Sequence, residues 1–380
     1  MVDLKGQYEK IKDEIDRAVI ECIESAAFIN GPAVKNFQTN LEKYLNIKHV
    51  IPCANGTDAL QIALMALDLK PGDEVIVPAF TYVATAEVIA LLRLTPVMID
   101  VDADTFNTTA EFIEAAITPR TKAIVPVHLF GQSCEMEAIM HLAEKHNLYV
   151  IEDNAQAIGA NYTFSGGTTK KTGTIGHIGT TSFYPAKNLG AYGDGGAIFT
   201  NDDELAKRMR MIANHGQTET YYHDLVGVNS RLDSIQAAIL DIKLKHLDEY
   251  AAARNAVADI YDQAFAGINQ IQTPSRAKNS THVFHQYTVQ IKNGRRDEFK
   301  KFLTEQGIPN SIFYPVPLYN QKAFKVSAIE NFTLPNTETL CEAVISLPIH
   351  TEMTEEHLQT ITDTIKSYFE AENAQTTTGI

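Results

Sequence analysis

Cysteines are scarce in this chain, and they are not grouped. Only four of its 380 residues are cysteine, with no C-x-x-C pair and no histidine at zinc-ligand spacing: Cys22, Cys53, Cys134 and Cys341. This spacing argues against a zinc site and against a disulfide framework. We therefore expect the four side chains to be small buried hydrophobic groups, and we expect the chain to bind no metal.

Long apolar runs and an excess of positive charge are also missing. No apolar run approaches the roughly 18 residues that a membrane-spanning helix requires. Against 47 Asp and Glu there are only 32 Lys and Arg, which gives a formal net charge of −15. This balance disfavours nucleic acid and anionic membranes as partners, because both attract basic surfaces. Residues 1–16 lack the features of an export signal, so we expect a cytoplasmic protein.

The first two thirds of the chain alternate short apolar strands with amphipathic helices. Such alternation is typical of an α/β domain with a mostly parallel sheet. We predict strands at residues 74–77, 96–99, 123–127, 149–151, 180–183 and 197–200. Apolar residues at three- and four-residue intervals predict helices at residues 58–67, 83–92, 110–117 and 136–146, and an acidic N-cap predicts another at 201–210.

The pattern changes in the last third of the chain. We predict one or two long helices within residues 232–265, a strand at 286–291, helices at 296–306 and 355–369, and a frayed end at 371–380. Because 380 residues exceed one ordinary core, two domains are expected. We place a large ligand-binding domain at 1–245 and a smaller C-terminal α+β domain, with a long linking helix, at 246–380.

Two charged residues occur where an α/β sheet would hold a ligand. Asp153 follows a predicted strand, and ligands bind at the carboxyl ends of such strands. Lys187 lies in a mainly uncharged segment between a strand and a glycine turn, where partial burial would lower its pKa. A lysine of lowered pKa can form a Schiff base with an aldehyde, and an aspartate can keep a pyridinium ring protonated as an electron sink. Taken singly, Asp153 could equally be a helix cap, and most lysines are simply solvated.

A candidate phosphate site begins another predicted helix. Gly56 and Thr57 lie at its start, where free N–H groups and the helix dipole favour an anion, although a capped helix without a ligand would have the same sequence. Ser182 is a plausible second phosphate ligand. Tyr82 follows a strand and a proline, so its ring could stack on a cofactor or belong to the core.

These segments together resemble the DegT-type sugar-nucleotide aminotransferases, which are fold-type I pyridoxal-phosphate-dependent transferases. The resemblance extends along nearly the whole chain and is carried by residues 3–8, 28–32, 54–60, 78–82, 152–156, 182–187, 193–196, 227–233, 314–318 and 346–348. It implies pyridoxal 5′-phosphate as cofactor, pyridoxamine 5′-phosphate as its amine form, and L-glutamate as the amino donor.

The resemblance also implies roles for individual residues. Lys187 would hold the cofactor as a Schiff base and shuttle the proton, with Asp153 on the pyridinium nitrogen and Gln156 on the phenolic oxygen. The phosphate would contact Gly56, Thr57, Ser182 and, from the second subunit of a homodimer with shared active sites, Asn229. Arg231 and Tyr314 match positions that line the sugar-nucleotide pocket, and their alternative roles are a surface ion pair and a core tyrosine.

Within the family, residues 53–67, 78–87 and 227–240 look most like enzymes that aminate C3 of a UDP-2-acetamido-2-deoxy-3-keto-glucuronic acid, a precursor of bacterial lipopolysaccharide O-antigen and other surface polysaccharides. Amination at C4 of a 4-keto-6-deoxy sugar nucleotide is the alternative within the enzyme class. Dehydratases of the same family have histidine at the Schiff-base position, so Lys187 argues against them. A non-catalytic regulator that binds the cofactor is the alternative from another class.

Overall fold

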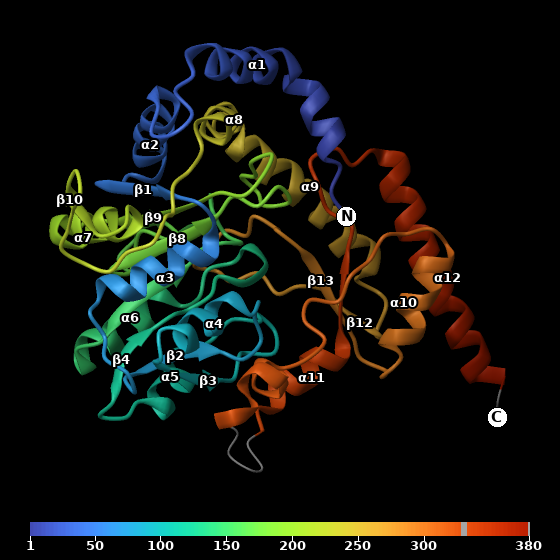
Figure 1. The fold of residues 1–380 in the computed structure, drawn as a ribbon. Helices are drawn as coiled ribbons and strands as arrows, with labels where there is room; N and C mark the ends of the chain where they lie inside the picture. The colour runs from blue at the N-terminus through green and yellow to red at the C-terminus, as the bar shows by residue number, and fades with distance from the viewer. Residues whose placement is uncertain (328–332, 379–380) are drawn as a thin grey trace.

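The fold is organised around one large mixed sheet. A computed structural model describes residues 1–327 and 333–378 (Figure 1). The strand order in the sheet is β1-β9-β8-β5-β4-β2-β3. The five strands from β8 to β3 run parallel, whereas β9 is antiparallel to both β8 and β1. The strands of this large sheet are β1 (His49–Cys53), β2 (Glu74–Pro78), β3 (Thr95–Ile99), β4 (Thr121–Ile124), β5 (Tyr149–Asp153), β8 (Ile178–Ser182) and β9 (Gly196–Thr200).

The central strands are apolar because helices cover both of their faces. In β2, Val75 and Val77 belong to the same hydrophobic cluster as α3 (Gly56–Ala66) and α7 (Asp203–Ala213). Ile76, which points to the opposite face, belongs to the cluster of α6 (Met136–His146). The remaining helices of this region are α1 (Leu4–Ser25), α2 (Pro32–Leu45), α4 (Ala84–Leu91), α5 (Ala110–Ala116) and α8 (Ser234–Leu244).

The predicted α/β class and the six predicted strands are confirmed, with two differences in detail. The strand predicted at 123–127 is β4, which lies two to three residues earlier, and Pro126 follows its end. Strand β1 was not predicted. It contains Pro52 and pairs only with β9, and proline is tolerated in such an edge strand even though it weakens the strand signal.

A second hydrophobic core forms around the last third of the chain, at the right of Figure 1. It is built from α9 (Leu247–Phe265), β12 (Ile271–Gln272), β13 (Tyr287–Ile291), α10 (Arg296–Glu305), β14 (Val344–Leu347) and α12 (Glu355–Thr378). Helices α8 and α9 show that residues 232–265 form two helices. Helix α11 (Pro335–Ala343) contacts β13, and the predicted division between residues 245 and 246 stays a prediction.

The expected frayed end is wrong over residues 371–378, which continue helix α12; residues 379–380 lie outside the described residues. Tertiary contacts account for the difference. The Glu372 carboxylate is paired with Arg295 at 2.7 Å, and Asn373 accepts a hydrogen bond from Gln270 at 2.6 Å. These contacts stabilise the helical conformation of residues 371–378, which their polar composition alone does not favour.

Shorter elements complete the chain. Two small hairpins are formed by β6 (Asn161–Thr163) with β7 (Thr169–Lys171), and by β10 (Gln217–Glu219) with β11 (Tyr222–His223). All four cysteines are unpaired and buried, which confirms the expectation for them. Within residues 1–327 and 333–378, none of the helices combines the length and apolar character needed to cross a membrane.

Candidate active site

Asp153 ends β5 at the carboxyl edge of the large sheet, and its carboxylate is fixed by two donors. One oxygen accepts from the Thr85 hydroxyl at 2.8 Å, and the other accepts from the Ala155 N–H at 3.2 Å. The side chain is only 6% exposed. Thr85 was missed from the sequence, although its place in the first turn of α4, three residues after Tyr82, is where a hydroxyl can reach the sheet edge.

Lys187 lies in the turn that follows β8. This strand pairs with β5, the strand that ends at Asp153. The Lys187 side chain is half-buried. Burial lowers the pKa of the Lys187 ammonium to about 8, and the Asp153 carboxylate opposes that shift. The predicted lowering of this pKa is therefore found in the structure, and a substantial fraction of the amine is neutral near pH 8. A neutral amine is the form that attacks an aldehyde.

The first turn of α3 lies directly against the end of β8. Asn55 caps the helix by accepting from the Asp58 N–H at 2.8 Å, which leaves the N–H groups of Gly56 and Thr57 without intrahelical acceptors. A Cβ on Gly56 would come within 2.7 Å of the Ser182 Cβ. Glycine is thus needed for this close approach, which brings the helix N-terminus and the Ser182 hydroxyl to one place. Such an arrangement suits a phosphate group.

Gln156 and Tyr314 contact each other across the site. The Gln156 side-chain oxygen accepts from the Phe130 N–H at 2.8 Å, and its nitrogen donates to the Tyr314 hydroxyl at 3.2 Å. The Tyr314 ring lies 6.3 Å from the Tyr82 ring, and burial raises the Tyr314 pKa above its usual value. Tyr82 is 57% exposed, so its ring is available for stacking and is not part of the core.

Asn229 and Arg231 line a cavity of about 560 Å³ beside the N-terminus of α3. Asn55, the cap of α3, lines the same cavity, together with acidic and neutral residues: Ile29, Ala54, Gly193, Asp194, Asp233 and Gln236. Asn229 is exposed in the single chain. The structure therefore brings both predicted residues close to α3, whereas Tyr314 contacts Gln156 and Tyr82.

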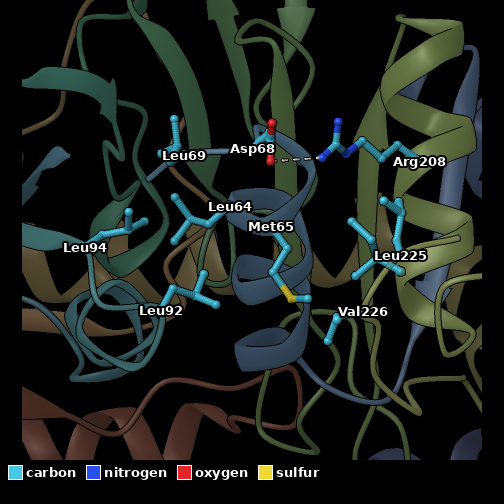
Figure 2. A pocket seen from close by; sticks show the side chains of 10 residues that line it. Leu64, Met65, Asp68, Leu69, Leu92, Leu94, Arg208, Leu225 and Val226 are labelled. Atoms are coloured by element: carbon cyan, nitrogen blue, oxygen red, sulfur yellow. Dashed lines mark ion pairs between the residues drawn. The ribbon is translucent and has the colours of Figure 1, made fainter. Parts of the chain in front are cut away.

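A smaller cavity of about 260 Å³ is separate from these residues. It lies at the C-terminal end of α3, away from Gly56, and its lining is mainly leucine, with Met65 and Val226 (Figure 2). An ion pair of 3.5 Å between Asp68 and Arg208 borders it, drawn as a dashed line in Figure 2. None of the predicted site residues lines this cavity.

Two polar residues near Lys187 make contacts that were not foreseen from the sequence. Asn188 donates to the Val283 carbonyl at 2.8 Å, which ties the lysine turn to the segment that leads into β13. His285 is buried, and burial together with the charges of Lys187 and Arg254 keeps its pKa well below the usual value. Their signals are weak in the sequence, because each depends on contacts between residues far apart in the chain.

The arrangement fits pyridoxal 5′-phosphate on structural grounds. It offers a half-buried amine of lowered pKa, a carboxylate held in place by Thr85, and a glycine-lined helix N-terminus against Ser182. These correspond to the aldehyde, the ring nitrogen and the phosphate of that molecule. The exposed Tyr82 ring supplies an aromatic surface nearby.

Known proteins resemble this chain over nearly its full length. A sequence profile described as the DegT/DnrJ/EryC1/StrS aminotransferase family matches residues 9–366. The chain is 47% identical over 349 residues to the UDP-2-acetamido-2-deoxy-3-oxo-D-glucuronate aminotransferase of Pseudomonas aeruginosa, covering 92% of this chain and 94% of that protein. It is 46% identical over 371 residues to the "Pleiotropic regulatory protein" of Geobacillus stearothermophilus, covering 97% and 98%.

A solved structure agrees with the fold in detail. The crystal structure of DesV from S. venezuelae, in complex with a ketimine intermediate, superposes with a TM-score of 0.92. It is 39% identical in sequence, and the superposition covers 97% of this chain and 98% of that chain. The similarity therefore includes both hydrophobic cores and the sheet edge that carries Asp153 and Lys187.

Proposed function

The chain belongs to the DegT/DnrJ/EryC1/StrS aminotransferase family, and we propose that it moves the amino group of L-glutamate to the 3-keto position of a UDP-2-acetamido-2-deoxy-hexuluronic acid. It is an aminotransferase whose cofactor is pyridoxal 5′-phosphate, with pyridoxamine 5′-phosphate as the amine-carrying form. We place the reaction in the cytoplasm, in the supply of precursors for lipopolysaccharide O-antigen or a related surface polysaccharide. The name of the P. aeruginosa relative supports the choice of sugar.

The observation that carries the proposal is the environment of Lys187. When bound, the cofactor supplies an aldehyde that captures amines and a ring that accepts the electron pair left on carbon. With a pKa of about 8, the Lys187 Nζ can exchange between amine and ammonium near neutral pH. In the proposed reaction this atom takes the proton from the α-carbon of glutamate, and it later delivers a proton to C3 of the sugar.

The other residues hold the reactants in place. The Asp153 carboxylate, which the Thr85 hydroxyl fixes, would accept a hydrogen bond from the protonated ring nitrogen. The N–H groups of Gly56 and Thr57, with the Ser182 hydroxyl, would hold the phosphate. Tyr82 would supply an aromatic surface for the ring, and Gln156, whose amide donates to Tyr314, would contact the phenolic oxygen.

We propose that Arg231 and Tyr314 bind the sugar nucleotide, and that Asn229 completes the phosphate site of the second subunit in a homodimer. Asn229 is exposed and lines the cavity that adjoins α3, as a residue shared between subunits would. Mixed dimers test the sharing. A dimer of Lys187→Ala with Asn229→Ala should regain close to half of the wild-type activity, because one site then has both residues. If Asn229 served its own subunit, no site would have both, and activity would stay low.

A visible absorption spectrum tests the reaction. Purified protein loaded with pyridoxal 5′-phosphate should lose the band of the lysine-bound cofactor when L-glutamate is added. The band should return with the UDP-linked 3-keto uronic acid and not with a dTDP-linked 4-keto-6-deoxy sugar. Return with the 4-keto sugar alone would favour amination at C4, the second candidate.

A regulatory role is the candidate from another class, and the name of the G. stearothermophilus relative favours it. The same titration decides between the two. A regulator without catalysis would keep its band when glutamate is added, whereas an aminotransferase would lose it and release 2-oxoglutarate.

A further inference from the structure

Helix α8 carries a lysine that is almost completely buried, and in the described part of the chain no carboxylate forms an ion pair with it. Lys243 is 1% exposed. Its ammonium donates to the Gly190 carbonyl at 2.8 Å and lies 4.3 Å from the centre of the Tyr192 ring. Burying a cation without an opposite charge is costly, and a methionine of similar length would fill the space without that cost. Lys243 is not among the residues that act in the proposed reaction.

Gly190 closes the turn that presents Lys187. Within the turn, the Lys187 N–H donates to the Tyr184 carbonyl at 2.8 Å. The turn ends where the Ala191 N–H donates to the Phe183 carbonyl, also at 2.8 Å. A Cβ on Gly190 would come within 2.3 Å of the Pro185 oxygen, so the chain returns here at very close approach. A hydrogen bond that fixes the Gly190 carbonyl therefore also restricts the backbone of the turn that contains Lys187.

Helix α8 binds this segment at two points on one face. Gln236 lies seven residues before Lys243, which is two helical turns, and its side-chain oxygen accepts from the Tyr192 N–H at 2.8 Å. The Tyr192 ring then covers the Lys243 ammonium and meets the edge of the Tyr8 ring of α1 at 6.1 Å. The sequence motif that contains Tyr8 thus packs against the same segment.

We propose that Lys243 is a positioning residue for Lys187: its buried ammonium holds the Gly190 carbonyl and so fixes the turn from which the Lys187 amine reaches the cofactor. The proposal rests on the proposed role of Lys187. A charged donor forms a stronger hydrogen bond to a carbonyl than a neutral donor does. This strength, together with the ring of Tyr192, offsets the cost of burying the charge.

The test compares two buried cations that bind backbone carbonyls. Lys243→Met removes the donor from the lysine turn. Arg296→Met is the control, because Arg296 is also buried and donates to backbone carbonyls, those of Cys341 and Val344 at 3.1 and 3.0 Å; unlike Lys243, it is also paired with a carboxylate, that of Asp297 at 2.6 Å. Two quantities are measured: hydrogen exchange of the Lys187 and Ala191 amides in cofactor-free protein, and the rate at which that protein gains the visible band on mixing with pyridoxal 5′-phosphate.

We expect Lys243→Met to speed exchange of both amides and to slow cofactor capture, each at least tenfold, while Arg296→Met changes neither. Equal effects of the two variants, or an unchanged Lys243→Met, would overturn the proposal. If Lys243→Met does not fold, Lys243→Gln decides: it keeps a neutral donor, so smaller changes in the same direction are expected, and no change would overturn the proposal. Wild-type protein that never gains the band would instead refute the proposed role of Lys187.

Discussion

The turn of Lys187 and the inner face of α8 each hold a lysine whose pKa burial lowers to about 8, yet the two surroundings differ. Lys187 is half-buried, and the Asp153 carboxylate acts on it. Lys243 is sealed between a carbonyl and an aromatic ring. A lowered pKa therefore does not identify a reactive lysine by itself. Partial exposure of the side chain and a carboxylate that favours the ammonium distinguish the reactive lysine.

The two lysines have a similar effect on stability but different roles. Both lysines reduce stability at neutral pH, because each is harder to protonate in the folded chain than in the unfolded chain. At Lys187 this cost yields an amine that is ready to react. At Lys243 it yields a strong, fixed hydrogen bond. Variants of the two lysines, and of the residues around Lys187, can test this contrast.

Removing the Lys187 amine should have the largest effect. We expect Lys187→Ala to lose the visible band and to reduce turnover by at least ~1000-fold, because its amine is the group proposed to capture the aldehyde and to move the proton. Its midpoint of thermal unfolding, measured without cofactor, should not fall, because a partly buried charge is removed. Steady transamination by this variant would contradict the role of Lys187.

Replacing Asp153, the carboxylate that acts on Lys187, should give the next largest effect. We expect Asp153→Asn, which preserves shape, to lower kcat by about 100-fold, since the ring nitrogen loses its anionic partner. Because Asp153 raises the Lys187 pKa, the variant should also shift the acidic limb of cofactor capture to lower pH. A pH profile of the capture rate measures this shift, and an unchanged profile would show that the two groups do not interact.

Much of this site could be predicted from the sequence because its signals are local. A strand followed by an acid predicted Asp153 at the sheet edge, and a glycine at a helix start predicted the helix N-terminus that lies against Ser182. The partners of these residues were not predictable in the same way. Thr85 and Asp153 lie 68 positions apart, and Lys243 and Gly190 lie 53 apart. Only the packing of α4 and α8 brings such pairs together, and no local pattern records that packing.

The two lysines should also differ in how they couple stability to pH, and Lys243 gives the cleaner measurement. Its pKa is about 8 in the folded chain and near 10.5 when unfolded, so the unfolded chain binds more protons between these values. Stability relative to Lys243→Met should therefore rise from pH 8 to pH 10.5, by up to about 3 kcal/mol. Chemical denaturation of both proteins without cofactor, at three pH values, measures the difference. A constant difference would mean that Lys243 is not buried as a charge.

The smallest expected effect comes from the hydroxyl that holds Asp153. Thr85→Val keeps the shape of a buried side chain but removes the donor to the charged carboxylate, a contact worth about 1.5 kcal/mol. We expect kcat to fall about tenfold while KM for glutamate changes little, because Thr85 acts through Asp153 and does not touch the donor. In an Asp153→Asn background the same change should have little further effect, because the charged acceptor is already gone. If the two substitutions instead act independently, Thr85 contributes only to packing, and the orientation of the carboxylate must come from the Ala155 N–H.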